Sequence, residues 1–451
     1  MISIPNKKVT LGIGTLIFLF DVILYVFATS ELIVFGKLYA SYLIISSFIL
    51  LFLAYKNKAD SVVLLVLSFF IIFYYGRLFS YLFVDSHLVF WLGGMIKLES
   101  NTIITVLSIT KLSFNILWAL LVFPIRSQKI YKNNSDFEKI GKIIFISMFP
   151  FALYNFVNEL IVIKQQGLLA FYTGSYRSGN LLSSILTLSS DLLDIGYFLI
   201  VASIPKKKTF KIFSYLFLFI MVFNSLKGIR GLFILPMMYY LWYNSRVYNI
   251  KILNKTNVLI FIGLFIFVQY LGASRFDNEA NYGIFDFTDS QGVTLNVTGF
   301  YFENAQSFKE DGYDFFVFAP VKFPYLYFKY RDDVVGQKPS SLKLRGDLNH
   351  SVTYKYNENY YLAGAGLGSS YIAELYEFGL LFVIIGSIFL GLFIRWFVGN
   401  LHKPIIMYFS YIVLTHLFII ARNSYFPNFW IILKYLIGYI FIIQFIKIIK
   451  R

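Results

Sequence analysis

A long polar interruption in an otherwise apolar chain constrains this sequence most. Near-continuous apolar stretches fill positions 9–272, a mostly polar segment follows at 273–358, and three further apolar stretches end the chain. A stretch of about 20 apolar residues can cross a bilayer as a helix, and the hydrocarbon core admits only helices or closed barrels. The apolar stretches are therefore predicted to be membrane helices, and the polar segment a substantial body outside the membrane.

The composition supports this reading and excludes several kinds of site. Hydrophobic residues make up 58% of the 451 residues and charged residues only 14%, whereas a soluble domain carries about 25% charged residues. The chain has no cysteine and only four histidines, which excludes disulfides, thiolate ligands and cysteine nucleophiles. The scattered histidines do not suggest a zinc cluster either. We therefore expect no metal and no cofactor.

The predicted fold class is an all-α polytopic membrane protein with about twelve transmembrane helices and one large outer segment. Three regions follow: an N-terminal membrane bundle over 1–272 with about nine helices, the outer segment 273–358, and C-terminal membrane helices over 359–451. The expected spans are 9–29, 38–54, 61–84, 103–123, 143–163, 181–204, 212–226, 231–244, 257–272, 365–394, 404–420 and 427–446.

The positive charge gives the orientation. The net charge of +16 is distributed over the short connections and not gathered on one polar domain, so nucleic-acid binding is not expected. Lysines and arginines concentrate in alternate connections, for example at 206–208, and such loops remain cytoplasmic. Both termini are therefore predicted to be cytoplasmic, and the segment 273–358 is predicted to lie on the opposite side.

Charges at the outer boundary are the main candidates for function. Lys227 and Arg230 lie in Lys227-Gly228-Ile229-Arg230-Gly231, which joins two spans in so few residues that both cations must sit at the membrane edge. Three further outward loops each carry one arginine, namely Arg177, Arg275 and Arg422. A guanidinium presents a fixed fork of donors suited to phosphate oxygens, so converging arginines are predicted to bind a pyrophosphate. The alternative is that each arginine only anchors its own helix.

Two residues are candidates for a catalytic base. Glu374 follows a glycine-rich stretch in which Ser369 or Ser370 caps a helix start, so it lies in the first turn of that helix. This helix-cap position alone explains an acid there, whereas partial burial beside an outer cavity would suit it to take a proton. His350 is the only histidine placed in the outer segment and is the other candidate base. Aromatic rings suited to stacking on sugars are Tyr176, Tyr360 and Tyr361.

These features together resemble the Wzy-type O-antigen and oligosaccharide repeat-unit polymerases, and the resemblance in architecture spans nearly the whole chain. The individual motifs are short, and their order carries the resemblance. They are Gly174–Arg177, Gly228-Ile229-Arg230-Gly231, the stretch from Tyr313 to Pro324, the late helix with Ala373-Glu374 and Phe378-Gly379, and Ala421-Arg422 before the last span.

The resemblance implies a GT-C-like glycosyltransferase of the bacterial inner membrane. The substrate would be an undecaprenyl-pyrophosphate-linked oligosaccharide, polymerised on the periplasmic side without nucleotide sugar or metal. A chain-length regulator protein is the partner expected from the family. This chain departs from the pattern in one respect: polymerases of this kind often carry a histidine close to the glycine/serine segment, where this sequence has Tyr360-Tyr361-Leu362-Ala363-Gly364 and His350 lies earlier.

The expected reaction is glycosyl transfer with a pyrophosphate leaving group. Such a transfer needs stabilisation of the departing charge and a base for the acceptor hydroxyl. Arg230, Arg177, Arg275 and Arg422 would supply the first, and Glu374 or His350 the second. The alternatives are an O-antigen ligase, which would move a finished chain onto a lipid core, and a flippase or transporter of the lipid-linked unit. A transporter is disfavoured because the sequence shows no internal repeat.

Overall fold

The protein, obtained as a computed structural model, is mainly helical over the residues that the structure describes. These are 7–31, 36–125, 133–173, 181–226, 231–250, 263, 284–334 and 336–449. Within these residues, seven helices are long and apolar enough to cross a membrane, and a shorter apolar helix spans Pro404–Phe418. The structure therefore agrees with the predicted all-α polytopic membrane protein.

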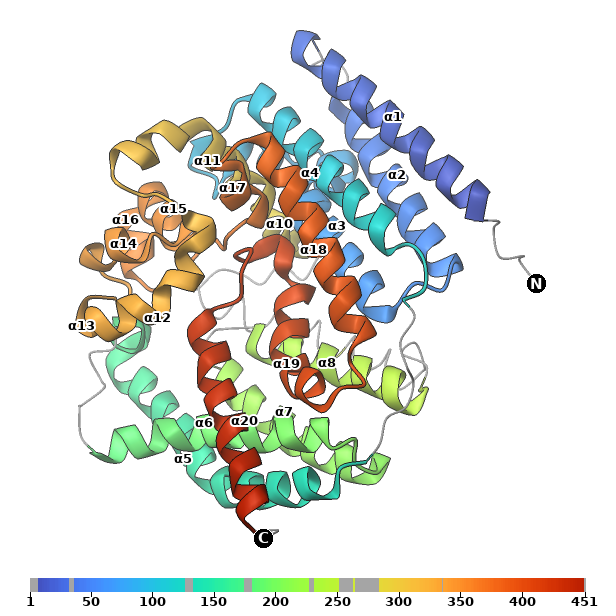
Figure 1. Cartoon of the computed structure of the whole chain (residues 1–451). Coiled ribbons are helices and arrows are strands. Elements are labelled where there is room, and N and C mark those ends of the chain that lie inside the picture. Colours follow the sequence, from blue (N-terminus) through green and yellow to red (C-terminus); the bar gives the residue numbers. More distant parts are fainter. Residues whose placement is uncertain are drawn as a thin grey trace.

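The long helices, among them the seven candidate membrane spans, form two groups (Figure 1). In the first group, α18 packs beside the N-terminal helices; its members are α1 (Lys7–Glu31), α2 (Gly36–Lys56), α3 (Ser61–Phe83), α4 (Ser100–Leu121) and α18 (Leu380–Gly399). The second group consists of α5 (Ser135–Thr173), α6 (Leu181–Ala202), α7 (Lys207–Ser225), α8 (Gly231–Tyr248), α19 (Pro404–Phe418) and α20 (Phe429–Ile449). Helix α3 joins the groups because it contacts both α8 and α19.

Short-range chemistry fixes the ends and the spacing of these helices. Asp60 caps α3 by accepting a hydrogen bond from the Val62 nitrogen, which satisfies one of the free amides at a helix start. Its other oxygen pairs with Arg246 of α8 at 2.7 Å. Helices α5 and α6 approach closely at Gly141 and Gly196, where an added Cβ would lie within 3.0 Å of backbone atoms of the facing helix. Small residues at such crossings permit tight helix packing in membranes.

The outer body contains short helices and one small hairpin, seen at the left and top of Figure 1. Its elements before the late membrane helices are η2 (His87–Phe90), β1 (Trp91–Leu92), β2 (Ile96–Lys97), α10 (Ile284–Gln291), α11 (Val293–Glu310), η3 (Phe316–Phe318), α12 (Ala319–Lys329), α13 (Arg331–Val334), α14 (Pro339–Arg345), α15 (Leu348–Tyr356), α16 (Glu358–Leu362) and α17 (Tyr371–Tyr376). Strands β1 and β2 pair antiparallel. The turn η4 (Ile420–Arg422) follows α19.

Arg77 of α3 fastens this outer body to the membrane bundle. Its Nη1 donates to the Leu88 and Trp91 carbonyls and, at 2.8 Å, to Oδ1 of Asn296 in α11. Its Nε donates to the carbonyl of Asp289 in α10. A buried guanidinium is tolerated only when its donors are satisfied in this way. The side chain therefore joins the hairpin, α10 and α11 to one membrane helix.

The structure refines one predicted span and shows how one apolar segment of the outer body folds. The span expected over 365–394 is divided: Ser370 caps the short α17, the chain turns at Gly379 with φ +89°, and α18 begins only at Leu380. Positive φ favours glycine, so this turn separates α17 from the membrane helix. The apolar segment over 315–328 forms η3 and α12, which packs against α20. The expected span 257–272 lies outside the described residues, apart from residue 263.

Candidate functional site

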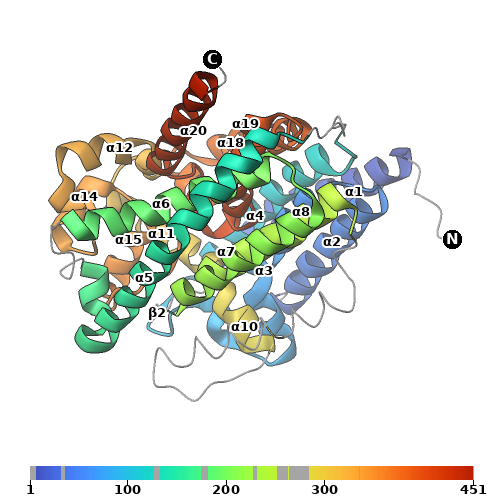
Figure 2. The same cartoon turned by 90° about the horizontal axis from the view of Figure 1, so that it is seen from below.

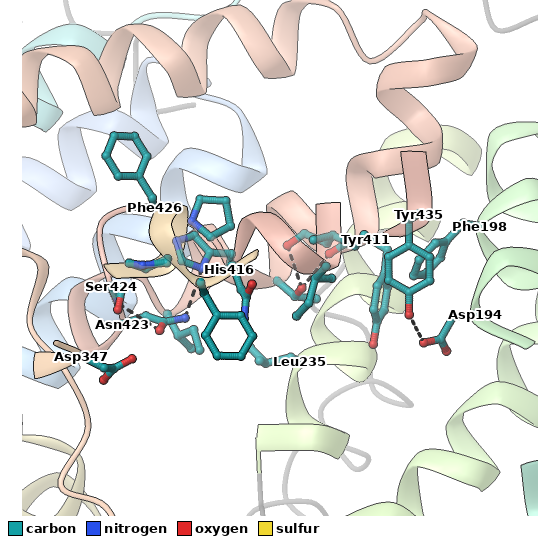
Figure 3. Close-up of a pocket in the computed structure, with 18 of the residues that line it drawn as sticks. Asp194, Phe198, Leu235, Asp347, Tyr411, His416, Asn423, Ser424, Phe426 and Tyr435 are labelled. Carbon is teal, nitrogen blue, oxygen red and sulfur yellow. Dashed lines mark hydrogen bonds between the residues drawn. The ribbon is translucent and has the colours of Figure 1, made fainter. Parts of the chain in front are cut away.

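A cavity of about 520 Å³ lies where the outer helices meet the second group of membrane helices (Figure 3). Ala319, Pro320 and Phe323 of α12 form part of its outer wall. Pockets of this size, with apolar walls and a few polar groups, are typical of small-molecule and cofactor sites. The polar lining residues are Asp194, Asn224, Arg345, Asp347, Tyr411, Thr415, His416, Asn423, Ser424, Asn428 and Tyr435.

A tight helix-to-helix turn presents Arg345 and Asp347 to this cavity. Helix α14 begins with Pro339 and ends at Gly346, whose φ of +57° is the left-handed conformation that favours glycine at a helix end. The next residue, Asp347, caps α15 by accepting a hydrogen bond from the His350 nitrogen at 3.3 Å. The sequence Arg345-Gly346-Asp347 thus stops one helix and starts another, with a cation and an anion on either side of the glycine.

The Arg345 guanidinium is available for a ligand. Its Nε is buried without a hydrogen-bond partner, and no acid among the described residues forms an ion pair with it. The guanidinium also lies over the ring of Phe323, at 5.6 Å from the ring centroid. A buried donor without a partner costs about 1–3 kcal/mol. An anion in the cavity would remove that cost, so this residue has the character of a phosphate-binding arginine.

The opposite wall comes from the membrane helices. Tyr435 of α20 donates to the Asp194 carboxylate of α6 at 2.5 Å, and the neighbouring Lys434 pairs with Asp191 at 2.6 Å. In Figure 3, Asp194 and Asp347 lie at opposite ends of the group of labelled residues. The cavity thus has a carboxylate at each end, one from a membrane helix and one from the outer body.

His416 lies at the wall beside η4. Its Nδ1 contacts Nδ2 of Asn423 at 3.2 Å, as the dashed line in Figure 3 indicates. Its Nε2 is buried and makes no hydrogen bond to the described residues. This histidine was not among the predicted site residues, because it lies in an apolar span. Its partner Asn423 directly follows Arg422, a residue that the sequence did single out.

Glu374 lies behind this wall and not in the cavity. The residue is fully buried, and its carboxyl accepts hydrogen bonds from the Ser369 hydroxyl at 2.7 Å and from the Tyr425 nitrogen at 2.8 Å. Burial raises the pKa of Glu374 to about 8, although both hydrogen bonds act in the opposite direction. In this position the side chain holds the loop that carries the cavity residue Ser424.

His350 and the two predicted sugar-stacking tyrosines pack together on the outer body. Nδ1 of His350 contacts the Tyr361 hydroxyl at 3.2 Å, and burial lowers the pKa of the imidazole to about 4. Tyr361 itself is fully buried, while Tyr360 is half-buried against Tyr356. None of the three predicted residues lines the cavity, although His350 bonds through its nitrogen to the lining residue Asp347.

Arg422 points away from the cavity that its neighbours line. Its Nη1 donates to the Ser290 carbonyl at 3.3 Å and to Oε1 of Gln291 at 3.0 Å. It also packs so closely on Gly368 that a Cβ there would lie 3.0 Å from the arginine Nε. The described partners of this guanidinium therefore attach η4 to the junction of α10 and α11.

The other predicted binding residues lie outside the described residues; these are Tyr176, Arg177, Lys227, Arg230 and Arg275. The residues on either side of one of their loops are described: Asn224 of α7 precedes Lys227, Leu235 of α8 follows Arg230, and both line the cavity. The structure adds Arg345 and Asp347 to the candidates. A signal for them was present in the sequence, because a proline, a glycine and an aspartate at 339, 346 and 347 mark a helix stop and start.

No group of three or more histidines, aspartates or glutamates suited to a metal ion occurs in the part of the chain that the structure describes. Comparison with protein families gives one assignment: the family model of the O-antigen polysaccharide polymerase Wzy matches residues 12–451. Comparisons with curated proteins and with solved structures give no match. The family match covers nearly the whole chain, including the residues that line the cavity described above and all but the start of α1. The chain therefore belongs to the O-antigen polysaccharide polymerase Wzy family.

Proposed function

We propose that this polymerase joins undecaprenyl-pyrophosphate-linked oligosaccharide units on the periplasmic side of the bacterial inner membrane, in the cavity between the outer body and the membrane helices. The observation that carries the proposal is the buried Nε of Arg345, which has no hydrogen-bond partner among the described residues, in a cavity of about 520 Å³. A lipid-linked sugar needs such a meeting point, because its diphosphate stays at the membrane edge while its sugars extend outward. The lining combines aromatic rings with several amides and hydroxyls, which suits carbohydrate.

Arg345 would stabilise the departing pyrophosphate. The negative charge on this leaving group grows in the transition state, and a donor already fixed in place stabilises it most there. Arg230, Arg177, Arg275 and Lys227 are proposed to add positive charge at the same membrane level. For Lys227 and Arg230 the support is that Asn224 and Leu235, which flank their loop, both line the cavity.

The transfer itself breaks one bond and forms one. The acceptor hydroxyl oxygen attacks the anomeric carbon of the growing chain, its proton passes to a carboxylate, and the carbon–oxygen bond to the pyrophosphate breaks. Undecaprenyl pyrophosphate leaves with the electron pair. We assign the proton to Asp347, because its carboxyl lines the cavity beside Arg345. Glu374 and His350 are proposed to position this site, through the Tyr425 nitrogen and through the first turn of α15.

The test is polymerisation of purified lipid-linked repeat units by the full-length protein in detergent or proteoliposomes. Arg345→Ala should lower the rate by roughly 100-fold or more, the loss typical of removing a preorganised donor to a developing anion. Arg345→Lys should retain part of the activity, because it keeps the charge but not the fork. Lys343→Ala is the matched control, since this exposed lysine lies on the same helix outside the cavity.

Two outcomes would overturn the proposal. Full activity of a folded Arg345→Ala variant would remove this arginine from the mechanism. Transfer of a finished chain onto a lipid acceptor without extension of the repeat units would instead identify a ligase.

A further inference from the structure

A second, apolar cavity of about 500 Å³ lies next to the proposed active site. We call it the tail groove and define it by its members Phe382, Phe389 and Phe393 of α18, Leu417 of α19, and Phe429 and Ile432 of α20. Helices α18 and α20 are both long and apolar enough to cross the membrane. The groove therefore lies partly between helices of membrane-spanning length.

The tail groove and the polar cavity share part of their walls. His416, Phe426 and Pro427 line both. Phe426 packs on Phe318 of η3, with ring centroids 6.3 Å apart, and edge-on against Tyr425 at 4.9 Å. A ligand that passes these shared residues would move from a mainly hydrophobic surface to one with Arg345, Asp347 and several amides.

The groove is open enough to admit a chain from the bilayer. Phe389 is 64% exposed and Phe393 is 40% exposed, although both point into a concave surface. Helix α20 projects from the body of the protein (Figure 2), and its first turns contribute Phe429 and Ile432 to the groove. The side of the groove that α18 forms is therefore open to the lipid around the protein.

From this arrangement we infer that the tail groove binds the polyprenyl chain of the lipid-linked substrate while the diphosphate lies in the polar cavity. The inference rests on the proposed function and adds to it the path of the lipid. A ligand with an anionic head and a long apolar chain would fill both cavities, with its head in the polar cavity and its chain in the tail groove. A free sugar phosphate would leave the groove empty, and a phospholipid alone would leave the carbohydrate surface empty.

The first experiment is photo-crosslinking in the full-length protein. A benzophenone amino acid replaces Phe389 or Phe429 in the groove, and Phe52 of α2 as a control, because Phe52 is also exposed on a membrane helix but lies outside the groove. The probe is polyprenyl pyrophosphate radiolabelled at the diphosphate. Crosslinks should form at Phe389 and Phe429, disappear with excess unlabelled polyprenyl pyrophosphate, and be absent at Phe52.

Two results would overturn the inference. Equal labelling at all three positions without competition would show only contact with bulk lipid. Crosslinks to phospholipid alone would make the groove a resident phospholipid site. A third result separates the two proposals. If unlabelled polyprenyl pyrophosphate abolishes the crosslinks but the protein does not polymerise lipid-linked repeats, the result supports binding of the polyprenyl chain in the tail groove and contradicts the proposed function.

The second experiment separates tail binding from chemistry. The double variant Phe389→Ser/Phe393→Ser should raise KM for the long-chain substrate by roughly tenfold, as expected from losing about 50 Å² of apolar contact. The same variant should have an unchanged kcat. Its KM for a substrate with a short, water-soluble prenyl chain should also be unchanged. An equal change for both substrates would assign the two phenylalanines a purely structural role.

Discussion

Glu374 Oε2 accepts a hydrogen bond from the backbone nitrogen of Tyr425 at 2.8 Å, and its other oxygen accepts from Ser369. This carboxyl therefore joins the glycine-rich stretch before α17 to the loop after η4. Asn423 and Ser424 of that loop line the cavity. A side chain outside the proposed active site thus controls the shape of one of its walls.

The first prediction concerns the two hydrogen bonds of Glu374. Glu374→Ala should lower the free energy of unfolding by about 2–4 kcal/mol, because it leaves a buried hydroxyl and a buried amide without partners. Glu374→Gln should cost less than about 1 kcal/mol, since its amide can donate to Ser369 while its oxygen accepts from Tyr425. Thermal unfolding in detergent measures both. Equal losses in the two variants would contradict the assigned bonds.

The second prediction is that the free energy of unfolding depends on pH through the ionisation of Glu374. Burial raises its pKa from 4.5 to about 8, so the folded state holds a proton that the unfolded state releases. The contribution to stability is complete below pH 4.5 and is lost as the pH rises through 8. Wild-type stability should therefore fall between pH 6.5 and 8 relative to Glu374→Gln.

This pH window also provides the control. His350 has a lowered pKa of about 4, so its contribution is complete above its ordinary value of 6.5 and is lost only in more acid solution. Differences between wild type and Glu374→Gln above pH 6.5 thus do not come from His350. Identical slopes for the two proteins over this range would contradict a protonated Glu374.

The third prediction separates the two roles of Asp347. Asparagine caps a helix about as well as aspartate, so Asp347→Asn should leave stability within about 0.5 kcal/mol of wild type. It should nevertheless lower the polymerisation rate by roughly 100-fold, because an amide cannot take the acceptor proton. Asp347→Ala should lose the same activity and about 1 kcal/mol of stability as well. An active Asp347→Asn variant would exclude this residue as the base.

The fourth prediction tests the turn between α14 and α15. Gly346 has φ +57°, and an added Cβ would meet only the Asp314 carbonyl oxygen, at 3.4 Å. Gly346→Ala should therefore cost about 1 kcal/mol, mainly from the left-handed backbone. Gly94 also has a positive φ of +76° but lies in open space away from the cavity. Gly94→Ala should show a similar loss of stability without a loss of polymerisation. A loss of polymerisation in Gly346→Ala alone would therefore come from displacement of Arg345 and Asp347 and not from backbone strain.

The membrane helices were the most predictable part of the fold, because hydrophobic length alone identifies them. Helices α2, α3 and α4 lie within a few residues of the predicted spans. The division of the span 365–394 was not predicted, since residues on both sides of Gly379 are apolar and only its φ of +89° reveals the turn. Composition records how hydrophobic a segment is, and not where its backbone changes direction.

The candidate site was harder to predict because it depends on the direction of side chains. Arg422 was correctly expected to lie in the connection before the last helix, yet its guanidinium contacts Ser290 and Gln291 on the far side of η4. Arg345 looked like an ordinary cation of the outer segment. Its importance appears only when α14 is packed over α12 and the Nε of the arginine is buried in the cavity without a hydrogen-bond partner.

Arg77 has a consequence for engineering new polysaccharides. Chimeras that exchange the outer segment between family members are an obvious route to altered sugar specificity. Such a graft must carry acceptors equivalent to Asn296 and the Asp289 carbonyl, or the buried Arg77 of the recipient loses two of its four acceptors. The practical boundary for a transplant therefore includes the hairpin after α3, which is far away in sequence but supplies two of the same acceptors.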